Sequence, residues 1–241
     1  MTIVWWKSPW TRSIYPLLSI FLLAHEVMAM RENCVNSSLD LKAEYLEFFT
    51  NAIMNLHYNP YTASKDGSDW PETALTMIGA RRLHNFAAIV SLVVNEGIHG
   101  DIIETGVWRG GASFLAAKTL ELFCDDRKVY MADSFSGIPD MPKDLKHYKG
   151  WIKDNSASRI EILNKNSVES VKRDLEVFGV NKSKVVFVEG YFNESLPRLV
   201  EHVNAPIFSV IRLDGDTYYS TMDSLKALYP RLSPGEFDDA S

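Results

Sequence analysis

The fold is decided by residues 101–111, which read Asp-Ile-Ile-Glu-Thr-Gly-Val-Trp-Arg-Gly-Gly. The apolar pair before Glu104 is typical of a buried strand, and glycines then precede an apolar helical run at 112–122. A glycine turn at such a junction lets a nucleotide-like ligand approach the backbone at the positive end of the next helix. The spacing is not the G-x-G-x-x-G dinucleotide pattern. Because an acid at the strand tip suits a ligand with a positive end and ribose hydroxyls, we expect S-adenosylmethionine (SAM) rather than NAD.

Strand and helix patterns alternate from this stretch onward. The expected strands are 102–104, 129–132, 185–189 and 208–213, and the expected helices are 112–123, 168–178, 196–203 and 218–229. This alternation predicts an α/β fold with a parallel sheet covered on both faces. Ligands of such sheets bind beyond the carboxyl ends of the strands. An acid ends each expected strand, namely Glu104, Asp133, Glu189 and Asp214, and these acids point to a site there.

Two helical stretches come before the first expected strand, at 39–57 and 73–94, joined by a loop. The chain therefore divides into a helical cap at 31–98 and a core at 99–241. With 241 residues and 46% hydrophobic content, one sizeable core can be buried. A net charge of −6 gives no basic field, so nucleic acid is not an expected partner.

The N-terminal residues 1–30 carry two basic residues, an apolar run at 14–24 and then small residues. This pattern is that of a secretory signal peptide, and a packed apolar helix is the alternative. The localisation, cytoplasmic or secretory, stays open. The run is too short for a stable membrane span, because a bilayer core is ~30 Å thick. Sequons for N-glycosylation begin at Asn36, Asn181 and Asn193 and would suit the secretory route.

The two cysteines, Cys34 and Cys124, form neither a disulfide framework nor a zinc pattern, and we interpret them as isolated thiols. The six histidines lack the H-E-x-x-H zinc spacing, and no G-x-S-x-G motif supports a serine hydrolase.

Two acids near the glycine turn are candidate cofactor ligands. Asp133 is placed to accept ribose hydroxyls, and capping a turn at Ser134 is its alternative. Glu104 could meet the ammonium group of the ligand or support the glycine turn, and the sequence leaves both open.

A second centre lies at residues 212–218, which read Arg-Leu-Asp-Gly-Asp-Thr-Tyr. Asp214 is the favoured metal ligand or base, since carboxylate oxygens suit a hard cation such as Mg²⁺. Asp216 or Thr217 is better placed as the N-cap of the following helix. Asp238 and Asp239 could add carboxylates, or could belong to a solvated tail.

Several longer motifs of the chain extend these signals. They are Thr-Met-Ile-Gly at 76–79, Arg-Leu-His-Asn at 82–85, Ala-Asp-Ser-Phe-Ser-Gly-Ile-Pro at 132–139, Glu-Gly-Tyr-Phe at 189–192 and Leu-Asp-Gly-Asp-Thr-Tyr at 213–218. Together with 100–111 they cover roughly residues 73–235. In these motifs, their order and their spacing, the chain resembles the macrocin O-methyltransferase family of SAM-dependent sugar methyltransferases.

The resemblance implies a class I, Rossmann-like methyltransferase fold and Mg²⁺-assisted methylation of a hydroxyl on a sugar or similar natural-product-like small molecule. Asp214 would bind Mg²⁺ and could act as the base. The implied cofactor contacts are Glu104, Thr105, Gly106, Asp133 and Ser134. A coordinated hydroxyl is a better nucleophile because Mg²⁺ lowers its pKa.

The C-terminal residues depart from the family pattern. In family members, Pro-Gly is followed by a second glycine, an apolar strand and an Asp-Asp pair that completes the metal site. Here Gly235 is followed by Glu-Phe and then by Asp238 and Asp239. Either the chain is a truncated or alternative product that lacks the last strands, or its metal site is built in a shortened way. An exposed sheet edge favours association, and a homo-oligomer stays open. The alternative function is a non-catalytic SAM-binding or interaction domain.

Overall fold

A parallel sheet of four strands forms the centre of the molecule, in the order β3-β2-β1-β4. The computed structural model describes residues 39–57, 73–138 and 166–234. The strands are β1 (Asp101–Thr105), β2 (Val129–Asp133), β3 (Val185–Glu189) and β4 (Phe208–Leu213). All four strands expected from the sequence are present, and every pair is parallel.

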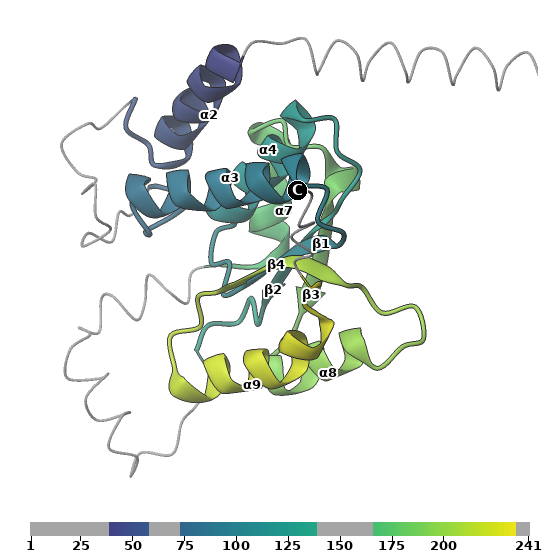
Figure 1. Cartoon of the computed structure of the whole chain (residues 1–241). Helices are drawn as coiled ribbons and strands as arrows, with labels where there is room; N and C mark the ends of the chain where they lie inside the picture. The colour runs from purple at the N-terminus through teal and green to yellow at the C-terminus, as the bar shows by residue number, and fades with distance from the viewer. Residues whose placement is uncertain (1–38, 58–72, 139–165, 235–241) are drawn as a thin grey trace, which may run out of the picture.

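Helices cover both faces of this sheet (Figure 1). On one face lie α2 (Leu39–Ile53), α3 (Ala80–Asn95), α4 (Gly111–Leu122) and α7 (Val168–Val177). On the other lie α8 (Phe192–Val200) and α9 (Tyr218–Leu228). Short 3₁₀ turns, η2 (Lys182–Lys184) and η3 (Tyr229–Arg231), follow α7 and α9. The α/β prediction is confirmed.

Strand β1 shows why the strands carry consecutive apolar residues. Its side chains alternate between faces, so Ile102 enters the core under α2, α3, α4 and α7, and Ile103 enters the core under α8 and α9. Both are fully buried. Helices α2 and α3 share the first core with α4. The division at residue 98 into a cap and a core stays a prediction.

Two helix starts differ from the sequence expectation. Helix α3 begins at Ala80 rather than 73, because the backbone of Leu75 is bonded elsewhere: its N–H donates to Ile53 O at 2.8 Å and its carbonyl accepts from Gly111 N at 3.0 Å. Helix α8 begins at Phe192 rather than 196, although Pro197 lies inside it. Proline lacks the N–H of an interior turn but does not prevent the helix from starting five residues earlier.

The cysteine interpretation was wrong, because Cys124 is disulfide-bonded. The chain's only other cysteine, Cys34, lies outside the described residues. Residues 1–30 and the pair Asp238 and Asp239 also lie outside them. Among the helices that the structure describes, none combines the length and the apolar character that crossing a membrane requires.

Candidate active site

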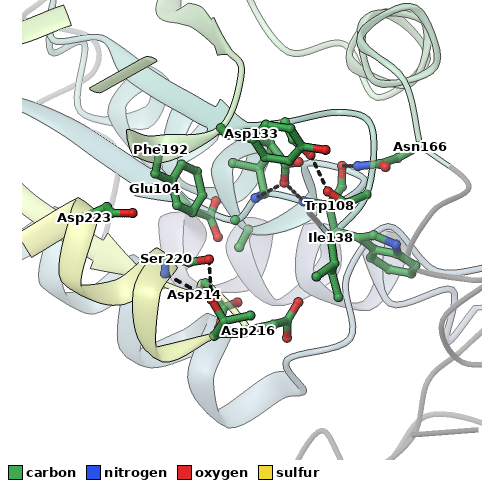
Figure 2. Close-up of a pocket in the computed structure, with 18 of the residues that line it drawn as sticks. Glu104, Trp108, Asp133, Ile138, Asn166, Phe192, Asp214, Asp216, Ser220 and Asp223 are labelled. Carbon is green, nitrogen blue, oxygen red and sulfur yellow. Dashed lines mark hydrogen bonds between the residues drawn. The ribbon is translucent and has the colours of Figure 1, made fainter. Parts of the chain in front are cut away.

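A cavity of about 490 Å³ opens at the carboxyl ends of β1, β2 and β4 (Figure 2). Its volume lies within the ~300–1,000 Å³ typical of small-molecule sites. One part of its wall comes from the β1–α4 turn and the end of β2, and another comes from the start of α9. The lining includes Glu104, Gly106, Trp108, Asp133, Ser134, Asn166, Asp214, Asp216, Tyr219 and Asp223.

Asp133 organises the β1–α4 turn. Its Oδ2 accepts the N–H groups of Val107 at 2.9 Å and Trp108 at 3.1 Å, and its Oδ1 accepts the N–H of Phe135 at 2.9 Å. Burial raises the pKa of the Asp133 carboxyl above its usual range, although these backbone hydrogen bonds oppose that effect. Three of about four acceptor positions on a carboxylate are thus used within the protein. At most one is left for a ligand hydroxyl.

Gly106 is required by the protein itself at this turn. Its φ is +87°, which favours glycine. A Cβ there would overlap the carbonyl oxygen of Asp214 and lie 2.8 Å from its carbonyl carbon. Asp214 N also donates to Thr105 O at 2.8 Å. The glycine therefore lets the β1 turn and the end of β4 touch, which is a packing role in addition to the ligand approach expected from the sequence.

Glu104 is 2% exposed and bonded on two sides. It accepts from the Ser113 hydroxyl and from Nη1 of Arg212, its neighbour across the β1–β4 ladder. Burial raises the pKa of Glu104 to about 7, against the opposing influence of the Arg212 cation and the Ser113 hydrogen bond. Nη2 of Arg212 donates to Oδ2 of Asp214 at 2.9 Å. One guanidinium thus joins the acid of β1 to the acid of β4.

Asp214 and Asp216 follow β4 and are exposed acids of the cavity. In Figure 2 their side chains lie on the opposite side of the hollow from Asp133. Although Asp216 is reached by solvent, the surrounding protein desolvates it, and this effect together with the charges of Asp214 and Asp133 raises its pKa to about 6. A carboxylate with such a pKa can take up a proton near neutral pH.

The capping alternatives left open by the sequence are resolved at α9. Thr217 is the N-cap, and its hydroxyl accepts from Ser220 N at 3.0 Å. Asp216 is therefore free of that role and lines the cavity. The sequence offered Asp216 or Thr217 for capping, and Thr217 is confirmed; it gave Arg212 no role. Strand periodicity could have found Arg212, because residues 212 and 214 point to the same side of β4.

The remaining predicted residues have different positions. Ser134 lines the cavity and its hydroxyl donates to Gly137 O at 2.6 Å. Thr105 is 1% exposed and contributes its carbonyl to the β1–β4 contact rather than a surface of the cavity. Glu189 is exposed and is not part of the lining.

The donors present suit a hard cation, but those described are incomplete as a site. Asp214, Asp216 and Asp223 offer carboxylate oxygens, which Mg²⁺ prefers. Within residues 39–57, 73–138 and 166–234, no group of three or more His, Cys, Asp or Glu side chains is arranged to hold a metal ion.

After η3, the last described residues run beside β4. Ser233 N donates to Phe208 O at 2.8 Å, next to a parallel bridge of Leu232 to Phe208. The described part of the chain therefore ends next to the start of β4.

Comparison with known proteins agrees with the motifs. The chain matches the macrocin O-methyltransferase (TylF) family model over residues 17–239. It belongs to this family. The chain is accordingly an O-methyltransferase, and the family implies SAM as the methyl donor.

Individual members are similar over most of the chain. This chain is 36% identical over 214 residues to the 8-demethyl-8-(2,3-dimethoxy-alpha-L-rhamnosyl)-tetracenomycin-C 4'-O-methyltransferase of Streptomyces olivaceus. The match covers 82% of this chain and 78% of that protein. It is 34% identical to the mycinamicin III 3''-O-methyltransferase of Micromonospora griseorubida, covering 80% of each. The solved structure of the O-methyltransferase NovP superposes with a TM-score of 0.70 at 35% identity, again covering 80% of each chain.

Proposed function

We propose that this enzyme transfers the methyl group of SAM to a hydroxyl of a sugar or of a similarly hydroxylated, natural-product-like small molecule, with assistance from Mg²⁺. The observation that carries the proposal is one cavity that joins the β1–α4 turn to the carboxylates after β4. Relatives named for methylating sugar positions of glycosylated compounds support the acceptor class.

The turn side of the cavity fits the cofactor. Gly106 and Ser134 line it, and Asp133 holds the turn with at most one acceptor position left for a ligand. Glu104 lies beneath the same wall, bonded to Ser113 and Arg212. In this proposal these residues bind SAM, with the positive end of the cofactor toward Glu104 and a ribose hydroxyl toward Asp133.

The β4 side fits the acceptor and the metal. Asp214, fixed by Arg212 at 2.9 Å, would hold Mg²⁺ through its remaining oxygen, with Asp238 and Asp239 as the further ligands. When bound, SAM supplies a methyl group activated by its sulfonium, and Mg²⁺ supplies positive charge that lowers the pKa of an acceptor hydroxyl.

The residues that would remove the hydroxyl proton also lie on the β4 side of the cavity. Asp214 or Asp216 would take the hydroxyl proton onto a carboxylate oxygen, and the pKa of Asp216 favours it for this step. With SAM bound, the hydroxyl oxygen would form a bond to the methyl carbon while the carbon–sulfur bond breaks, which would leave S-adenosylhomocysteine. Alignment of the two partners is largely a positioning effect, which the shared cavity provides.

The test is methyl transfer from radiolabelled SAM to a panel of glycosides and glycosylated macrolides, with Mg²⁺ and with EDTA. We expect methylation of a sugar hydroxyl that EDTA abolishes. Equal turnover with EDTA would remove the metal from the proposal. Turnover confined to acceptors without a sugar would instead change the acceptor class.

A further inference from the structure

The amino ends of the strands lie opposite the cavity. This end of the sheet carries two features that the methyltransferase function does not use. One is the sequon Asn181-Lys182-Ser183, which lies in the loop between α7 and β3. The other is the disulfide-bonded Cys124, which follows α4 and precedes β2. We propose that Asn181 is an N-glycosylation site and that the chain folds in an oxidising secretory compartment.

The geometry of Asn181 suits this modification. Asn181 and Ser183 are both exposed, and the loop is ordered by an Asx turn in which Asn181 Oδ1 accepts from Ser183 N at 2.9 Å. Within the part of the chain that the structure describes, Asn181 Nδ2, the atom that carries a glycan, makes no hydrogen bond. A bulky polar glycan is tolerated on such a surface loop.

The position of Asn181 also leaves the active site open. Asn181 precedes the amino end of β3, whereas the cavity lies at the carboxyl ends of the strands. A second sequon, Asn193-Glu194-Ser195, makes a useful contrast. Asn193 lines the cavity, and the Ser195 hydroxyl is buried and bonded to Gly190 O and Tyr191 O, each at 3.0 Å. A glycan on Asn193 would stand in the cavity, so we expect that sequon to be unmodified.

The compartment follows from independent observations. A structural disulfide persists in an oxidising environment and is rare in the cytosol. The sequon loop is bonded to the segment that contains Cys124: Asn181 N donates to Glu121 Oε1 at 2.8 Å, and Lys128 Nζ donates to Ser183 O at 2.6 Å. The apolar run at 14–24, with basic residues before it, supplies the signal-peptide pattern that entry requires.

The experiment is secretory expression of the full chain in insect cells, followed by site-resolved mass spectrometry after enzymatic deglycosylation in heavy-oxygen water. We expect labelled aspartate at position 181 and unlabelled asparagine at 193. Ser183→Ala should abolish the label at 181, and Ser183→Thr, which keeps the sequon, should retain it. Cys124 should resist alkylation until it is reduced.

Two results would overturn the proposal. One is an unmodified Asn181 in folded, secreted protein. The other is retention of the chain in the cytosol with Cys124 alkylated before reduction. Neither outcome depends on the acceptor, on Mg²⁺ or on SAM, so this proposal and the proposed function fail separately.

Discussion

The acids that end β1 and β2 differ from those that follow β4, although the sequence presents them alike. Glu104 is 2% exposed and bonded to Ser113 and Arg212, and Asp133 accepts three backbone N–H groups. Asp214 and Asp216 are exposed in the same cavity. The first pair chiefly builds the wall that receives the cofactor, whereas the second pair keeps oxygens available for a cation or a proton.

Arg212 and Gly106 connect the two regions. Arg212 bonds an acid of each, and Gly106 allows the β1 turn to touch the Asp214 carbonyl. The difference between the regions teaches that partners and burial, rather than position at a strand tip, separate structural acids from chemically available ones. Substitutions can break or sharpen that distinction.

The largest effect is expected for Asp214→Asn. Loss of the carboxylate should lower turnover by about two orders of magnitude or more, because a metal ligand or base is removed. Affinity for S-adenosylhomocysteine should stay within about twofold, since Asp214 is not part of the proposed cofactor wall. Radiolabel transfer and calorimetry measure the two quantities. Asp174→Asn on α7 is a matched control and should change neither.

Arg212→Met should cost more stability than substitutions of the exposed cavity acids do. It leaves buried Glu104 without its cation, and removing one partner of a buried pair costs about 3–5 kcal/mol. The double variant Glu104→Gln with Arg212→Met should recover much of that loss. Urea unfolding of wild type, both single variants and the double variant completes the cycle; strictly additive losses would show that the pair is not coupled.

Gly106→Ala tests the contact between the two regions. Gly179 has a similar positive φ of +63°, but a Cβ added there would meet nothing within 4 Å, so Gly179→Ala reports backbone strain alone, about 1–2 kcal/mol. Gly106→Ala should cost about 1–3 kcal/mol more, because its Cβ meets the Asp214 backbone. Denaturant unfolding compares them. Equal losses would mean that the close approach is relaxed without cost.

Asp133→Ala should weaken cofactor binding by about 1–3 kcal/mol, mainly because two N–H groups of the β1–α4 turn and that of Phe135 lose their acceptor. Asp133→Asn keeps one acceptor oxygen and should fall between alanine and wild type. Calorimetric titration with S-adenosylhomocysteine measures this series. An unchanged dissociation constant in Asp133→Ala would remove Asp133 from the cofactor wall.

The smallest effect concerns pH. If Asp216 is the base, turnover should fall about tenfold per pH unit well below 6, because its carboxylate becomes protonated as the pH drops through a pKa of about 6. Above that value turnover should level off. The profile of kcat between pH 5 and 8 tests this. The control variant Asp223→Asn should keep the fall in kcat at acidic pH. If kcat does not fall at a pH below about 6, Asp214 rather than Asp216 is the base.

Much of this architecture could be predicted from local pattern. The apolar strands and the glycine turn indicated the parallel sheet, and the acids at the strand ends indicated the edge that carries the cavity. What could not be predicted depends on neighbours distant in sequence. Arg212 meets Glu104 only across the β1–β4 ladder. Between the two N-cap candidates that the sequence left open, the structure selects Thr217 through its local bond to Ser220. The disulfide at Cys124 was likewise missed, since two cysteines give no spacing pattern.

The central claim is that the cavity between the β1–α4 turn and the end of β4 binds SAM. Calorimetric titration of S-adenosylhomocysteine into the full 241-residue chain tests it most directly. We predict saturable binding in the micromolar range that survives Asp214→Asn and weakens in Asp133→Ala. A cooperatively folded chain that releases no binding heat, and shows no thermal stabilisation by the ligand, would contradict the account.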